Sequence, residues 1–222
     1  MTKRVKTSKH SETTLEIPMP RWVGGSFLEL VQEFNDRYLE SLMRLAEKGD
    51  TGSLPDIPRR HGRLWTSIDT HARRRASLCP VILADFRFRN VIWWRNAADG
   101  KDANHQNIGR SGVARIDEME MARNALTVAW LTAREDLCLA TLLIGMSVEV
   151  AEIVAGFTLH GLWQLADQSH GCLRPRYEKR AVFWGRLLRA AARDDRTMLH
   201  DIHLHAILLA DTEHGGRAST HV

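Results

Sequence analysis

The chain has 222 residues, of which 44% are hydrophobic and 26% are charged, and its formal net charge is +4. These fractions match globular proteins and exclude a collagen-like, low-complexity or wholly disordered chain. The longest apolar stretch, Leu137 to Ile144, is far shorter than the ~20 residues that span a bilayer, and residues 1–14 lack the apolar stretch of a signal peptide. We therefore expect a cytoplasmic protein that does not bind membranes.

The cysteines indicate a reduced protein. Cys79, Cys138 and Cys172 are odd in number and lie far apart in the sequence. Such a set fits neither a disulfide framework nor a zinc knuckle. We expect all three to be free thiols.

A group of histidines near the C-terminus is the best candidate for a metal site. His200 and His203 are spaced by about one helical turn and could join Cys172. His205, however, points away from that face by roughly 200°. The chain also has no HExxH, GxSxG, Walker or GxGxxG motif. We expect no metal site, no cofactor and no enzymatic activity.

Residues 1–20 are basic and poor in apolar side chains, which is typical of a disordered arm. Residues 21–95 are expected to form a mostly helical N-terminal region. Within it, a stripe of apolar residues at helical spacing predicts an amphipathic helix over 26–47, which Gly49 ends. Residues 49–60 concentrate glycine and proline, so we expect a loop there.

A second helix is expected over residues 62–78, where apolar side chains recur at helical spacing until Cys79-Pro80 stops it. Residues 81–94 are rich in β-branched and aromatic side chains and could form a strand, a short helix or extended chain. Residues 96–114 hold three glycines and almost no large apolar groups. This composition predicts a linker between two domains.

Residues 115–213 show the patterns of consecutive helices and are expected to form a second, all-helical domain. Ser147 and Thr158 are suitable N-caps, and Gly145 is a suitable helix end. The expected helices cover 119–133, 137–144, 147–155, 158–168, 183–192 and 198–210. Residues 214–222 are expected to be a disordered tail, and no repeat of fixed period is evident. The predicted fold class is mainly α.

The helices expected over 147–155 and 158–168 are separated by only Gly156 and Phe157. So short a turn forces a large crossing angle, which makes the pair similar to a helix-turn-helix. Helical hairpins with a glycine in the turn are common in helical proteins. The pair by itself is therefore weak evidence for DNA binding.

Two basic runs add to this evidence. Between Arg174 and Arg196 there are eight basic residues against three acidic ones. Between Arg59 and Arg95 there are nine arginines against two acidic residues, and several alternate with aromatic side chains. Such local excesses are what the neutralisation of phosphate groups requires, although single arginines often lie over a core with their charge in solvent.

The stretch from Leu126 to Gln168 contains paired helices, a Gly-hydrophobe-Ser elbow at Gly145 to Ser147, an alanine-rich helix, and a Thr-Leu entry to a helix that closes in Leu-Ala-Asp. This ordered succession resembles the core of the FlhD family of flagellar transcriptional regulators. The similarity continues through Arg176-Tyr177 and the terminal helices, and covers roughly residues 119–212. Pro175 departs from the usual pattern.

The resemblance implies a helix-turn-helix-like activator that binds DNA as a dimer or with an FlhC-like partner and recruits RNA polymerase. It places a homodimer surface on the helix over 119–133, including Leu126 and Trp130. Family members are about half as long as this chain. The resemblance therefore implies no role for residues 1–115.

Four cations after the hairpin are the leading candidates for DNA contacts: Arg174, Arg176, Lys179 and Arg180. Pro175 interrupts this segment, so the four side chains cannot all enter one major groove from a regular helix. We expect them to contact phosphates, which position a protein on DNA without reading its sequence. The second candidate is the cluster Arg73, Arg74 and Arg75.

The alternative class is a helical adaptor that binds protein rather than DNA. The chain has seven tryptophans, which could supply interface anchors, although tryptophan on an amphipathic helix usually belongs to the core. The candidates are Trp93, Trp94, Trp163 and Trp184. Salt separates the two classes, because affinity for DNA falls steeply with salt and an apolar contact is nearly insensitive to it.

Overall fold

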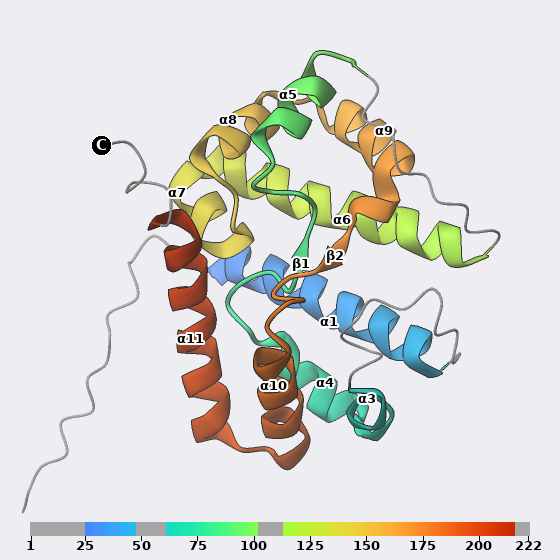
Figure 1. Ribbon diagram of the computed structural model, residues 1–222, viewed down its shortest axis with the longest axis vertical. Helices are drawn as coiled ribbons and strands as arrows, with labels where there is room; N and C mark the ends of the chain where they lie inside the picture. The colour runs from blue at the N-terminus through green and yellow to red at the C-terminus, as the bar shows by residue number, and fades with distance from the viewer. Residues whose placement is uncertain (1–24, 48–60, 102–112, 216–222) are drawn as a thin grey trace, which may run out of the picture.

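The structure is a computed structural model that describes residues 25–47, 61–101 and 113–215 (Figure 1). Within these ranges the fold is mainly α-helical, as predicted, and two short strands form the only sheet. The predicted arm over 1–20, the loop over 49–60 and residues 102–112 of the predicted linker lie outside the described residues.

The elements follow one another in two series. The first series is α1 (Gly25–Glu47), α3 (Gly62–Ser67), α4 (Thr70–Ser77), β1 (Ala84–Asp85) and α5 (Val91–Ala98). The second is α6 (Val113–Glu135), α7 (Leu137–Leu139), the π-helical turn η1 (Ala140–Ile144), α8 (Val148–Gly156), α9 (Leu159–Ser169), the 3-10 turn η2 (His170–Cys172), β2 (Arg174–Pro175), α10 (Ala181–Arg193) and α11 (Arg196–Gly215). The helix predicted over 26–47 is confirmed by α1, and α11 runs slightly into the predicted tail.

The structure corrects the prediction of one continuous helix over residues 62–78. The single helix expected there is two helices, because the Asp69 carboxylate accepts a hydrogen bond from the amide of Ala72 at 2.7 Å and starts α4. The segment over 81–94, left open by the sequence, is irregular from Val81 to Asn90 apart from the two residues of β1. There the Asn90 side chain accepts from the amide of Trp93 at 3.0 Å and begins α5.

Local signals in the second series worked as predicted. The Ser147 hydroxyl accepts from the amide of Val150 at 3.3 Å, and the Thr158 hydroxyl accepts from the amide of Gly161 at 3.1 Å. Gly145 ends the π-helical turn with a φ of 80°, which glycine adopts without a steric penalty. The two helices of the predicted hairpin are thus α8 and α9.

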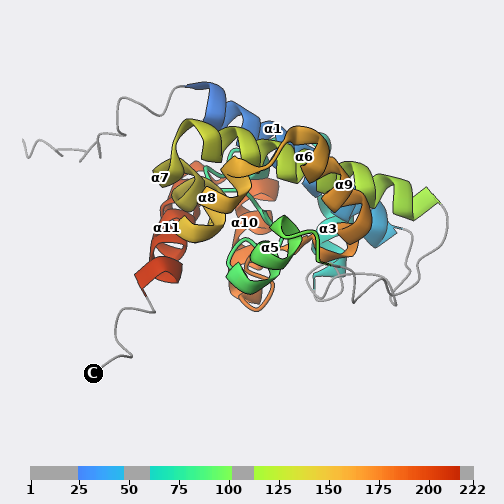
Figure 2. The same cartoon turned by 90° about the horizontal axis from the view of Figure 1, so that it is seen from above.

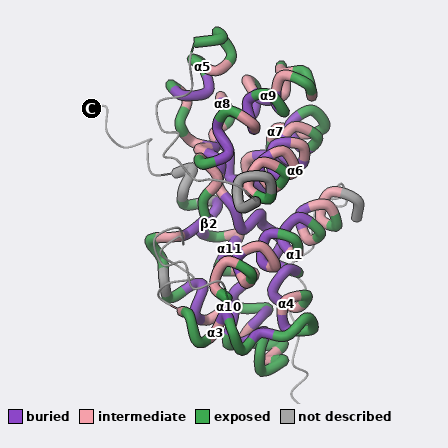
Figure 3. Tube along the Cα trace, turned by 90° about the vertical axis from the view of Figure 1, so that its right-hand side faces the viewer, coloured by how far each residue is buried: buried purple, intermediate pink, exposed green. Residues whose placement is uncertain are grey.

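The two series share one hydrophobic core, so the predicted boundary at 96–114 does not separate two domains. Helix α1 packs along α6, α5 packs on α8, and α10 packs on α3 and α4. Figures 1 and 2 show α1 and α6 side by side, and Figure 3 shows buried residues running through both series. Composition indicates that α5 and α6 are separate elements but does not indicate which helices of the two series pack on each other.

No single helix in the described ranges is both long and apolar enough to cross a membrane. The segments Leu137–Ile144 and Val148–Gly156 reach that length and composition only as a pair, and they are bent by 115° relative to each other.

Candidate functional site

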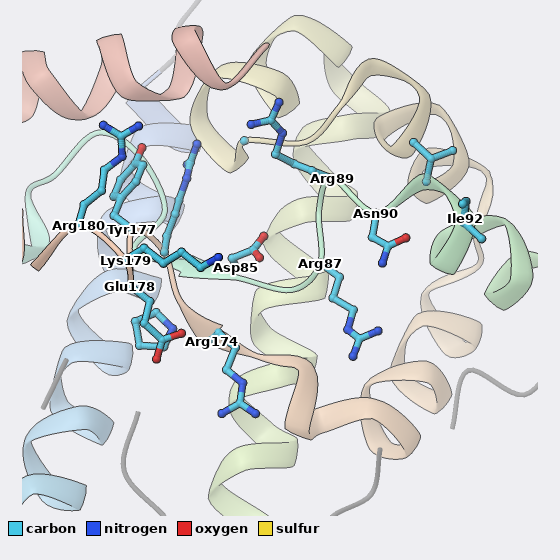
Figure 4. Close-up of a pocket in the computed structure, with 14 residues that line it drawn as sticks. Asp85, Arg87, Arg89, Asn90, Ile92, Arg174, Tyr177, Glu178, Lys179 and Arg180 are labelled. Carbon is cyan, nitrogen blue, oxygen red and sulfur yellow. The ribbon is translucent and has the colours of Figure 1, made fainter. Parts of the chain in front are cut away.

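The two basic runs of the sequence meet at the strand pair. Strands β1 and β2 are antiparallel, with Ala84 opposite Pro175 and Asp85 opposite Arg174. Beside them lies a cleft of about 830 Å³, whose walls come from residues 85–92 and 174–180. Figure 4 shows the labelled side chains of both segments around it. Pairing of the strands therefore joins segments that are far apart in the sequence into one site.

The chain leaves both strands in the same way. Arg87 and Tyr177 have positive φ angles of 53° and 60°, which are uncommon for residues with a side chain. The amide of Arg176 donates to the carbonyl of Leu83 at 2.8 Å, which ties the two segments together beside the paired residues. These turns carry the residues that follow each strand onto the walls of the cleft.

The cleft is strongly basic. Six cations line it against two carboxylates: Arg87, Arg89, Arg174, Arg176, Lys179 and Arg180 against Asp85 and Glu178. Of the six, Arg174, Lys179 and Arg180 are exposed to solvent. A concave surface lined by one sign of charge concentrates its electric field and attracts ligands of the opposite sign. The arrangement is suited to binding phosphate groups.

Arg176 is placed differently from the other predicted contacts. It is only 5% exposed, its guanidinium donates to the carbonyl of Leu143 at 3.4 Å, and it lies 5.0 Å from the ring centre of Tyr177. A β-carbon on Gly145 would come within 2.2 Å of Arg176 Nη2, so only glycine fits beside it. Arg176 supports the floor of the cleft, and we correct its expected role as a surface phosphate contact.

The arginines of α4 are largely used within the fold. Arg73 pairs with Asp36 on α1 through two hydrogen bonds of 3.0 and 3.2 Å. Arg75 donates to the carbonyl of Ala191 on α10 at 2.8 Å. Only Arg74 is fully at the surface, and none of the three lines the cleft. The sequence could not distinguish these arginines from the basic cleft residues, because their partners lie on distant helices.

Leu126 is not available for the homodimer surface expected on α6. Leu126 is 0% exposed, because α6 is covered by α1, α8 and α9 of the same chain. The Trp130 indole donates to the carbonyl of Phe157 at 2.9 Å, and Arg134 lies over its ring. An apolar stripe shows that a helix face is covered but does not show whether the same chain or another covers it.

The predicted hairpin does not itself supply cations. Neither α8 nor α9 contains lysine or arginine, and α8 carries Glu149 and Glu152. On α9, Asp167 pairs with Arg123 of α6 at 2.5 Å. Both helices pack on α6. A phosphate-binding surface on this protein is therefore better placed at the cleft, which follows the hairpin in the chain.

The sequence predicts only part of the cleft. Arg87 and Arg89 belong to a predicted basic run, but they are not among the predicted site residues. The signal that could have found them is the alternation of arginine with Phe86 and Phe88, because both phenylalanines are fully buried while Arg87 and Arg89 are partly exposed.

Among the described residues, the cysteines and histidines form no cluster that could hold a metal ion. Within residues 25–47, 61–101 and 113–215 no three metal-ligating side chains come together. The three cysteines are free. Burial raises the pKa of the Cys79 thiol to about 12, so this thiol stays protonated at neutral pH.

His203 on α11 gives a testable pH dependence. Burial, with a smaller contribution from His200, lowers the pKa of His203 to about 4. The unfolded chain, with a pKa of about 6.5, then binds a proton that the folded chain does not, so stability falls as pH drops from about 6.5 toward 4. Allowing for its partial exposure, we expect a loss of about 2 kcal/mol in the free energy of unfolding.

Urea denaturation at a series of pH values measures this loss. His203→Leu should flatten the profile between pH 6.5 and 4, whereas His205→Gln at an exposed position of the same helix should leave it unchanged. Equal profiles for wild type and His203→Leu would show that another group causes the dependence.

A comparison with protein-family models, curated proteins and solved structures finds no match to this chain. The functional assignment therefore depends on the geometry and charge of the cleft.

Proposed function

We propose that this protein is a DNA-binding transcriptional regulator and that its basic cleft contacts the phosphate backbone. The observation that carries the proposal is the convergence of six cations from two distant segments on one concave surface. Contacts from lysine and arginine to phosphates supply most of the nonspecific affinity of proteins for DNA. Six cations against two carboxylates give the lining of the cleft a net charge of +4.

The cleft cations position the protein and do not read bases. Arg174 lies on a two-residue strand, and Lys179 and Arg180 lie in the turn before α10. None of them projects from the face of a regular helix, which is the usual way to reach base edges in the major groove. Sequence preference would then come from the shape of the DNA or from a partner protein.

The resemblance to the FlhD family is the second support for this proposal. It adds an FlhC-like subunit and RNA polymerase as proposed partners, and activation of promoters as the proposed outcome. Neither flagellar genes nor a particular DNA sequence follows from the cleft.

A salt titration of DNA binding tests the proposal. Each phosphate contact removed should lower the slope of log affinity against log salt by roughly 0.9, so Arg174→Ala/Arg180→Ala should lower it by about 2. Both side chains are exposed, and the variant should keep its fold. Binding should be measured with an FlhC-like partner present where one exists. An unchanged slope would remove these residues from the interface.

The adaptor alternative loses most of its anchors in the structure. Trp94 and Trp184 are fully buried, and Trp93 is nearly so, which makes all three part of the core. Of the four candidates, Trp163 alone is substantially exposed, and its indole donates to the Thr127 hydroxyl at 3.1 Å. Affinity for a protein partner that does not change with salt would favour this alternative.

A further inference from the structure

The two series of elements repeat one pattern. Helices α1 and α6 are both 23 residues long, and each leads to a pair of shorter helices (α3 and α4, or α8 and α9), a two-residue strand and another helix. The second series also contains α7 and η1 between α6 and α8, and η2 before β2; the positions 90 residues before α7 and η1 lie almost entirely outside the described residues. The repeat therefore covers residues 25–47 and 61–98 in the first series and 113–193 in the second, with α11 added at the end. It was not evident in the sequence because few side chains are shared.

The strand pair sets the register of the repeat. A shift of 90 residues takes Ala84 to Arg174 and Asp85 to Pro175, and so exchanges the two paired strands. The same shift takes Arg87 to Tyr177, the two residues with positive φ that leave the strands. The shift maps each strand onto its partner. Two antiparallel strands that are equivalent in this way are related by a local two-fold axis through the centre of the pair.

Hydrogen bonds beyond the strands keep this register. The amide of Asn90 donates to the carbonyl of Arg87 at 2.9 Å, and the amide of Arg180 donates to the carbonyl of Tyr177 at 2.8 Å. Asn90 and Arg180, again 90 residues apart, are the N-caps of α5 and α10. The turn between strand and helix is thus the same in both copies.

The following helices also match in their side chains. Trp94 and Trp184 are 90 residues apart, are both fully buried, and each donates its indole N–H to a carbonyl of the preceding turn. Each stands perpendicular to its neighbouring ring, at 88° to Trp93 and at 90° to Phe183. Ile92 and Val182 are both 73% exposed.

The last helix of each copy packs on the other copy. Helix α5 lies against α8, where Trp94 meets Phe157 with ring centres 6.1 Å apart. Helix α10 lies against α3 and α4, where Trp184 meets Trp65 with ring centres 6.0 Å apart. Each copy therefore completes the core of the other, as two subunits do when they exchange an element.

The basic cleft lies across the two-fold axis. Both members of four equivalent pairs line it: Asp85 and Pro175, Arg87 and Tyr177, Arg89 and Lys179, Asn90 and Arg180. A surface that contains both members of several pairs cannot belong to one copy alone. The cleft is incomplete without either copy.

We propose that this chain is a fused dimer, in which residues 25–98 and 113–193 are two copies of one unit and the basic cleft is a single site that both copies build. Its surfaces for pairing are occupied within the chain, since α6 is covered by α1. One chain then binds one nucleic acid ligand without a second copy. That the ligand is a nucleic acid rests on the proposed function. The pairing of the two copies within the chain does not.

Sedimentation equilibrium of the full chain tests the pairing. We expect a mass of 25.3 kDa, that of one chain, over a wide range of protein concentration. A mass that rises with concentration to that of two chains would overturn the proposal, because it would show that the fused units still need a second copy.

A DNA titration tests the shared cleft. Arg89→Gln and Lys179→Gln, one from each copy, should each lower the salt slope by about 0.9, and the double variant by about 1.8. A labelled duplex should saturate at one chain per duplex. Two chains per site, or an effect from only one of the two positions, would overturn the shared site. If the wild type shows no salt-dependent binding, the proposed function and the nucleic acid part fail, and the measured mass still decides the pairing.

Discussion

Replacing Leu126 with aspartate is expected to unfold this protein rather than to separate two chains. Leu126 is 0% exposed on the face of α6 that meets its own neighbours. The substitution removes a well-packed side chain and places a carboxylate where it has no solvent. We expect the free energy of unfolding to fall by about 4 kcal/mol or more, against a total stability of about 5–15 kcal/mol for a typical protein.

Circular dichroism with urea denaturation measures this effect. Leu131→Asp is the matched control, because Leu131 is on the same helix and is 37% exposed, so the variant should lose little stability. A Leu126→Asp variant that keeps the stability of the wild type would contradict the core placement. A wild type that sediments as two chains, with a folded variant that sediments as one, would restore the dimer surface.

Replacing Asn35 with leucine is expected to have the second largest effect. Asn35 is a fully buried amide on α1, and its Nδ2 donates to the carbonyls of Cys79 and Val81 at 3.1 and 3.0 Å. Its Oδ1 accepts from the amide of Leu83 at 2.8 Å. Leucine would leave these buried backbone groups without a partner, at a cost of about 3 kcal/mol or more.

The same urea denaturation measures the Asn35→Leu variant. Gln32→Leu is the matched control on the same helix, because Gln32 makes one long bond of 3.4 Å to Leu78 near the surface. Equal losses for the two variants would show that Asn35 does not hold the segment over 79–83. Because that segment leads into β1, the Asn35 variant should also weaken the cleft.

Local signals made much of the fold predictable. Ser147, Thr158 and Gly145 each act on backbone groups within four residues, so the sequence alone indicates what they do. The single helix wrongly predicted over residues 62–78 also has a local cause. Asp69 is an N-cap residue in the middle of an apolar stripe, so it starts a new helix where the periodicity alone predicts a continuous one.

Contacts between distant segments were not predictable from one sequence. Arg73 and Arg174 look alike as members of basic runs, yet one is paired with Asp36 inside the fold and the other lines the cleft. Arg176 looked like a surface cation and is buried beside Gly145. The cleft itself depends on the pairing of β1 with β2, two strands too short to give a clear pattern.

A charge-matched pair of variants tests the account most directly. The first removes three exposed cleft cations with Arg174→Gln, Lys179→Gln and Arg180→Gln. The second removes three exposed cations that do not line the cleft, with Arg63→Gln, Arg193→Gln and Arg196→Gln. Arg193 is about 20 Å from the cleft, since it is 13 residues along α10 at 1.5 Å per residue.

The measurement is the slope of log affinity for duplex DNA against log salt, for wild type and both variants. The cleft variant should lower the slope by about 2.7, and the control should leave it nearly unchanged, although both lose the same net charge. Equal decreases in the two variants would contradict the account, because binding would then follow net charge and not the cleft.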